Sequence, residues 1–142
     1  MATYFEGAVK QGTNPSEYGN DVGYATFVRT ATLQAATVSN VDATIPVPRG
    51  AQILSITADT SVAWTATGAV TFTAGITAGG TEYITSVDLK TVVRSAPTLT
   101  AAQVGAMANV GTNTNVVVRA NSASGANATG TTLVTVLYAA KL

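Results

Sequence analysis

The sequence predicts an all-β fold: an antiparallel β-sandwich with a jelly roll as the first choice, an extended N-terminal arm and at most one short helix. Threonine and valine, which are β-branched and favour strands, dominate the chain. About seven to nine short strand-like segments are separated by regular turn signals. Because about eight strands fit a chain of 142 residues, a jelly roll is favoured. An immunoglobulin-like sandwich is the alternative, although the chain lacks the cysteines of antibody domains.

The chain divides into an N-terminal arm, residues 1–24, and a β-sandwich domain, residues 25–142. The arm contains Pro15 among several glycines and shows no sustained hydrophobic period, which indicates an irregular or extended segment. Aromatic side chains on such a segment either tuck against their own domain or anchor on a partner. The arm carries the aromatic residues Tyr4, Phe5, Tyr18 and Tyr24. We expect a chain without the residues before about Val22 to fold but to assemble less well.

The first strand patterns follow the arm. Residues 25–34 predict a strand, although its apolar positions do not alternate cleanly, so its facing stays open. Residues 36–48 predict a second strand that ends at Pro46 and Pro48. Because proline has no N–H to donate, this end belongs at a sheet edge or in a loop. Residues 51–59 predict a third, mostly buried strand.

The only tryptophan of the chain, Trp64, lies between Ala63 and Thr65. A lone tryptophan in a sandwich packs in the core, or its ring offers a stacking platform for a sugar. The first interpretation is favoured, and the second stays open.

The stretch TFTAGITAGGTEYI, residues 71–84, has three glycines, and a glycine-rich run can cradle a phosphate. This one has neither the Gly-Lys pair of a Walker loop nor a helical pattern after it. The residues before Gly79 alternate between apolar and polar positions, as in a strand with one buried face. We therefore predict a hairpin with a type I′ turn at Gly79–Gly80, followed by a strand over residues 81–89.

Two further patterns lie in the C-terminal third. Thr100 and Gln103 match a capping box and predict a short helix up to about Met107. Residues 115–122 and 131–140 predict two strands, and the Gly/Asn/Ser-rich segment between them predicts that they form a hairpin.

Composition excludes several classes of function. The chain has no histidine and no cysteine, which rules out serine–histidine, cysteine–histidine and thiolate chemistry. Charged residues make up 10% of the chain and sum to zero net charge, whereas a nucleic-acid binder has a basic surplus. No apolar run approaches the roughly 20 residues that span a bilayer. A surface so poor in charge favours coverage by neighbouring subunits in an assembly.

Carboxylates are the remaining candidates for chemistry. A glycosidase needs two of them about 5–9 Å apart, but only 6% of the residues are aromatic, which is poor for a sugar cleft. Glu82 and Asp88 fit solvated strand ends. The complete set is Glu6, Glu17, Asp21, Asp42, Asp59, Glu82 and Asp88. We predict no catalytic, cofactor-binding or metal-binding residue among them.

Three segments carry a family resemblance: IPVPRGAQILSITAD, VTFTAGITAGGTEYITSVDLKT and ATGTTLVTVLYA. From about Ala25 onward, the chain resembles the jelly-roll type of capsid cement, or head decoration, proteins of tailed bacteriophages. The resemblance implies a virion structural protein without enzymatic activity, made in the host cytoplasm and located on the outer capsid surface. It would bind the major capsid protein at junctions between capsomers, stabilise the shell and form a homo-oligomer, either a dimer or a trimer.

The expected partner interface consists of arm aromatics and one arginine. Arg49 lies in a Pro-Arg-Gly turn, where it is either a solvated loop charge or a salt-bridge donor to a partner. The predicted interface residues are Tyr4, Phe5, Tyr18, Tyr24 and Arg49. Composition and resemblance together predict no cofactor, small-molecule substrate, nucleic acid or membrane as a partner. Two alternatives stay open: a carbohydrate- or receptor-binding module of a virion fibre, based on Trp64, and a hydrolase that uses two carboxylates.

Overall fold

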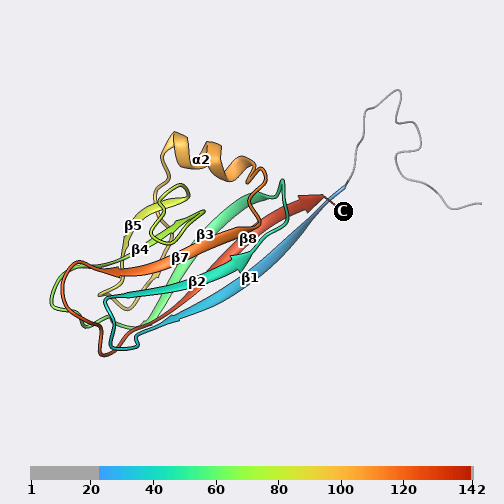
Figure 1. Ribbon diagram of the computed structural model, residues 1–142. Helices are drawn as coiled ribbons and strands as arrows, with labels where there is room; N and C mark the ends of the chain where they lie inside the picture. Colours follow the sequence, from blue (N-terminus) through green and yellow to red (C-terminus); the bar gives the residue numbers. More distant parts are fainter. Residues whose placement is uncertain (1–22, 142) are drawn as a thin grey trace, which may run out of the picture.

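The computed structural model describes residues 23–141, which form two four-stranded antiparallel sheets packed face to face (Figure 1). One sheet has the order β1-β8-β3-β6 and the other the order β2-β7-β4-β5. The antiparallel β-sandwich predicted from the sequence is therefore confirmed. The elements are β1 (Tyr24–Gln34), β2 (Asn40–Pro46), β3 (Gln52–Val62), β4 (Val70–Gly75), β5 (Ile84–Asp88), β6 (Arg94–Ser95), α2 (Ala101–Ala108), β7 (Asn115–Ser122) and β8 (Thr131–Lys141).

The strand order is that of a jelly roll. The pairs are nested in sequence, from the two ends of the chain towards its middle: β1 pairs with β8, β2 with β7, β3 with β6, and β4 with β5. The pairs β3·β8 and β4·β7 then join these ribbons into the two sheets. An immunoglobulin-like sandwich would instead have the orders ABED and CFG. The first choice from the sequence is confirmed, and the immunoglobulin-like alternative is wrong.

The hairpin predicted for residues 115–122 and 131–140 is wrong, because β7 and β8 lie in different sheets. The segment between them, residues 123–130, crosses from one sheet to the other. Alternation along each strand shows that one face is buried, but it does not identify the neighbouring strand. In the structure β8 is a central strand that pairs with both β1 and β3.

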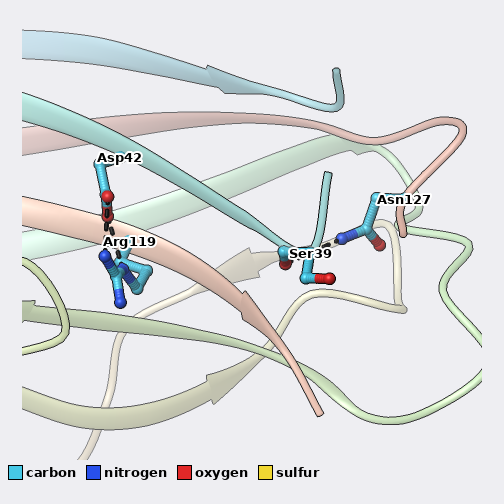
Figure 2. Close-up of polar contacts among 4 residues, drawn as sticks. All are labelled: Ser39, Asp42, Arg119 and Asn127. Atoms are coloured by element: carbon cyan, nitrogen blue, oxygen red, sulfur yellow. Dashed lines mark hydrogen bonds and ion pairs between the residues drawn. The ribbon is translucent and has the colours of Figure 1, made fainter. Parts of the chain in front are cut away.

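Asn127 fastens this crossing segment to two other loops. Its side chain is fully buried, and its Oδ1 accepts a hydrogen bond from the backbone N–H of Ala66 at 3.1 Å. Its Nδ2 donates to the carbonyl of Ser39 at 3.5 Å, which Figure 2 shows. Its backbone exchanges hydrogen bonds with Val38 and Thr37 at 3.1 Å. Three loops are thereby joined at the end of the sandwich opposite the start of β1.

The hairpin predicted around Gly79 is confirmed, since β4 and β5 pair antiparallel, but its turn type is wrong. The N–H of Gly80 donates to the carbonyl of Thr77 at 2.9 Å, and Gly79 has φ 79°. The turn therefore consists of Thr77–Gly80, with Ala78 and Gly79 at its centre. Only Gly79, the second central residue, has a positive φ, whereas a type I′ turn needs it at both, so the turn is type II. The carboxylate of Glu82 accepts from the N–H of Ile76 at 3.1 Å and closes the connection.

The predicted short helix is present as α2 and begins with the predicted capping box. The N–H of Gln103 donates to Oγ1 of Thr100 at 3.3 Å, and the N–H of Thr100 donates to Oε1 of Gln103 at 2.9 Å. The Nε2 of Gln103 also donates to Oγ1 of Thr85 at 2.8 Å. Because Thr85 belongs to β5 and α2 also packs on β3, the helix connects the two sheets along one side (Figure 1).

The core lies between the sheets and contains Trp64. The indole is 1% exposed, and its Nε1 donates to Oγ1 of Thr132 at 2.9 Å. The interpretation of Trp64 as a core residue is confirmed, and its use as a sugar-stacking platform is wrong. Pro46 ends β2, which is an edge strand, as the sequence predicted.

Candidate interaction surface

All four described carboxylates already have partners within the chain. Asp59 binds Arg94, and Asp42 binds Arg119. Asp88 and Glu82 are exposed near the ends of strands and accept hydrogen bonds from backbone N–H groups, which confirms their interpretation as solvated strand-end charges. No group of three or more Asp, Glu, His or Cys side chains that would suit a metal occurs among residues 23–141. The remaining carboxylates, Glu6, Glu17 and Asp21, lie outside the described residues.

The pair of Asp42 and Arg119 lies on the outer face of the β2-β7-β4-β5 sheet (Figure 2). Two parallel hydrogen bonds, at 2.6 and 2.8 Å, join the guanidinium to the carboxylate. The hydrogen bond from Arg119 lowers the pKa of Asp42 below its ordinary value of 3.8, although partial burial opposes the shift. The same bond raises the pKa of Arg119.

This pair predicts a small acid dependence of stability. Because the folded-state pKa of Asp42 is lowered, the stabilisation is present above the unfolded-state value and is lost as pH falls through the folded-state value. Since the Asp42 side chain is 41% exposed, we expect the pair to contribute less than about 1 kcal/mol. Urea denaturation between about pH 5 and pH 2 measures the contribution. The Asp42→Asn protein should lose less stability over this range than the wild type, and equal losses would contradict the assignment.

The two predicted interface residues within the described range lie at the same end of the sandwich. Tyr24 begins β1 and is 59% exposed, and in register it faces Lys141 at the end of β8. Arg49 is exposed in the turn between β2 and β3, just before Gln52, which also pairs with the end of β8. The other three predicted residues, Tyr4, Phe5 and Tyr18, lie outside the described residues.

The first half of β1 is an exposed apolar corner that sequence reasoning missed. Only Leu33 is buried in this strand of 11 residues. Phe27 and Val28 are consecutive and so point to opposite faces, yet they are 41% and 60% exposed. Strands of a packed sandwich bury one face. The only sign of this in the sequence was the missing alternation in residues 25–34.

Two contacts with Tyr138 hold the side of this corner that faces the core. The ring of Phe27 stacks on Tyr138 with a centroid separation of 5.6 Å. Arg29 donates from Nε to the hydroxyl of Tyr138 at 3.1 Å. These contacts come from β1 and its neighbour β8, and they leave Phe27 and Arg29 exposed.

The free edge of β1 lacks most of the protection that the other sheet edges have. Proteins protect edge strands by shortness, proline, charge or bulges. β6 has 2 residues and β5 has 5, while β2 carries Asp42 and ends at Pro46. β1 has 11 residues in an unbroken register with β8, contains no proline, and has Arg29 as its one charged residue. It is the edge best suited to accept another strand.

Two hollows in the described surface offer no catalytic arrangement. One, of about 250 Å³, lies between β3 and α2 and is lined mainly by apolar side chains, including Leu54, Val104 and Met107. A more open one, of about 400 Å³, contains the ion pair of Asp59 and Arg94. No helix in the described part of the chain is long and apolar enough to cross a membrane.

Comparison with known proteins identifies a shared fold. No protein-family model matches the sequence, and no curated protein matches it. Among solved structures, the chain is similar to one from the capsid asymmetric unit of cyanophage Pam1, with a TM-score of 0.54 and 20% identity. The similarity covers 95% of this chain and 96% of that chain. The two proteins therefore share their fold over almost their whole lengths.

Proposed function

We propose that this chain is a structural protein of a phage particle, a cement or decoration protein that binds the major capsid protein on the outer surface and stabilises the shell. The observation that carries the proposal is the fold shared over 95% of the chain with a component of a phage capsid. The sequence resemblance to cement proteins supports the same role independently.

The described surface supports a role in assembly. A cement subunit stabilises a capsid by binding across a junction, so that the junction cannot open without breaking the added interface. Stable interfaces bury roughly 1,200–2,000 Å² and are centred on aromatic and other large side chains. Tyr24, Phe27 and Val28 provide such side chains at one exposed corner. The low overall charge keeps the desolvation cost of binding small.

A structural role without catalysis is part of the proposal. Each described carboxylate is engaged with an arginine or a backbone N–H, which leaves none of them as an obvious acid or base. The carbohydrate-binding alternative rested on Trp64, and that side chain is buried.

Quantitative gels of purified virions test the proposal. We expect the protein in many copies, in a constant ratio to the major capsid protein. Particles made without it should release their DNA at a lower temperature, and adding the purified protein should restore the wild-type temperature. A few copies per particle, or unchanged heat release without the protein, would refute the proposal.

A further inference from the structure

The zero net charge of the chain is the sum of two opposite charges. Residues 1–22 have three acidic residues, Glu6, Glu17 and Asp21, and one basic residue, Lys10, and so carry a net charge of −2. The remaining residues have six basic and four acidic side chains and carry +2. The N-terminal segment and the sandwich are therefore complementary in charge.

The surplus cations of the sandwich gather where the N-terminal segment joins it. Arg94 and Arg119 are neutralised by Asp59 and Asp42. Lys90 donates to two loop carbonyls at the far end of the sandwich. The other cations form no ion pair within residues 23–141: Arg29, Arg49 and Lys141.

These three cations lie in the half of the sandwich in which β1 begins. Arg29 lies on β1 itself, and Lys141 is the register partner of Tyr24 at its start. Arg49 lies in the turn between β2 and β3. Figure 1 shows this turn at the end of the sandwich near the C-terminus. The half of the sandwich in which β1 begins is therefore positive, whereas residues 1–22 as a whole are acidic.

The N-terminal sequence contains a piece that suits the free edge of β1. Residues 2–11, ATYFEGAVKQ, contain no proline, and they include Tyr4, Phe5 and Val9, which favour strands. Residues 12–22, GTNPSEYGNDV, are rich in turn formers and contain Pro15, which suits a connection rather than a strand.

We propose that residues 2–11 of one copy of this chain pair as an added strand with the free edge of β1 in a neighbouring copy. Backbone hydrogen bonds to the edge provide affinity. Residues 2–11 themselves carry no net charge, because Glu6 and Lys10 cancel, so the attraction to the cations of the sandwich comes from Glu17 and Asp21 in the connection that follows. Strand addition also covers part of the exposed surface of Phe27 and Val28. The inference concerns contacts between copies and goes beyond the proposed attachment to a capsid.

The length of the connection favours a neighbouring copy over the same chain. A hairpin within one chain would need residues 12–22 as its loop, whereas hairpin loops are about two to five residues long. Extended, the same 11 residues span up to roughly 36–40 Å, which is enough to reach another subunit.

Crosslinking between full-length copies tests the pairing, because the chain has no natural cysteine. One copy carries Glu6→Cys and a differently tagged copy carries Thr30→Cys, on the exposed part of β1. A short bis-maleimide should join the two when they are mixed. Glu6→Cys mixed with Thr44→Cys is the control, because Thr44 is an exposed threonine on the other long edge strand, β2.

Each outcome decides the proposal. Efficient Glu6–Thr30 crosslinks with weak Glu6–Thr44 crosslinks support it. Equal yields, or no crosslinks, overturn it. A chain with both Glu6→Cys and Thr30→Cys, diluted into excess wild type, separates the sources: a crosslink within that one chain would overturn the assignment to a neighbour.

Charge reversal gives a second measurement on the full chain. Arg29→Glu should weaken self-association in sedimentation experiments by about tenfold at about 50 mM salt, and by much less at about 0.5 M. Unchanged association at low salt would overturn the electrostatic part of the proposal. Both experiments use purified protein, so their failure would leave the virion test of the proposed function unaffected.

Discussion

Replacing Gly130 with alanine is expected to destabilise the fold by about 4 kcal/mol or more, which places it among the most damaging single substitutions. Gly130 has φ 151°, a backbone conformation that side chains with a Cβ rarely adopt. A Cβ there would also lie 2.7 Å from Cγ and 2.9 Å from Cε2 of Trp64. The indole is buried and hydrogen-bonded to Thr132, so it has little room to move away.

Urea denaturation followed by the fluorescence of the single tryptophan measures this effect. Gly105→Ala is the matched control, because Gly105 lies in α2 and a Cβ there meets no atom within 4 Å. It should stabilise the protein by up to about 1 kcal/mol through the higher helix propensity of alanine. Equal urea midpoints for Gly130→Ala and the wild type would show that the indole adapts to the added methyl group.

Sequence reasoning predicted the sandwich well where the signals are local. The capping box at Thr100 acts over a few residues and occurs as predicted. The alternation predicted before Gly79 is wrong, because both faces of β4 are largely buried and Ile76 is exposed. Trp64 was assigned to the core because large apolar side chains are rarely left exposed when a sandwich interior is available.

The pairing of β7 and β8 could not be predicted in the same way. Both strands bury alternate residues, and a polar segment rich in glycine separates them, so they meet every local criterion for a hairpin. Their separation into two sheets follows from the nested pairing of the whole chain, in which β8 lies between β1 and β3. Only contacts distant in sequence decide this.

The candidate interaction surface was predicted in part. Tyr24 and Arg49 were chosen for their residue type and their position in an arm and a turn, and the structure leaves both exposed at one end. Phe27 and Val28 lie in a strand whose facing the sequence leaves open, so the sequence does not predict their exposure. Their exposure depends on β1 being an edge strand, a fact of topology rather than of local sequence.

A second large effect is expected when Thr132 is replaced by valine. The hydroxyl of Thr132 accepts from Nε1 of Trp64 at 2.9 Å and shares a hydrogen bond with the hydroxyl of Thr60 at 3.0 Å. All three side chains are buried. Valine has nearly the same shape, so it leaves the indole N–H and the Thr60 hydroxyl without this partner. Each buried group that loses its partner costs about 1–3 kcal/mol, and we expect a total loss of about 2–4 kcal/mol.

Thr73→Val should change the free energy of unfolding in the opposite direction. The comparison separates the effect of lost hydrogen bonds from the effect of replacing a threonine side chain by valine. Thr73 is 8% exposed, and its Oγ1 has no hydrogen-bond partner within the described residues. Removing this hydroxyl removes a desolvation cost, so Thr73→Val should stabilise the protein by about 1 kcal/mol. Urea denaturation of both variants measures the contrast. If both valines destabilised the protein equally, the loss would come from packing, and the polar contacts around Trp64 would not be its cause.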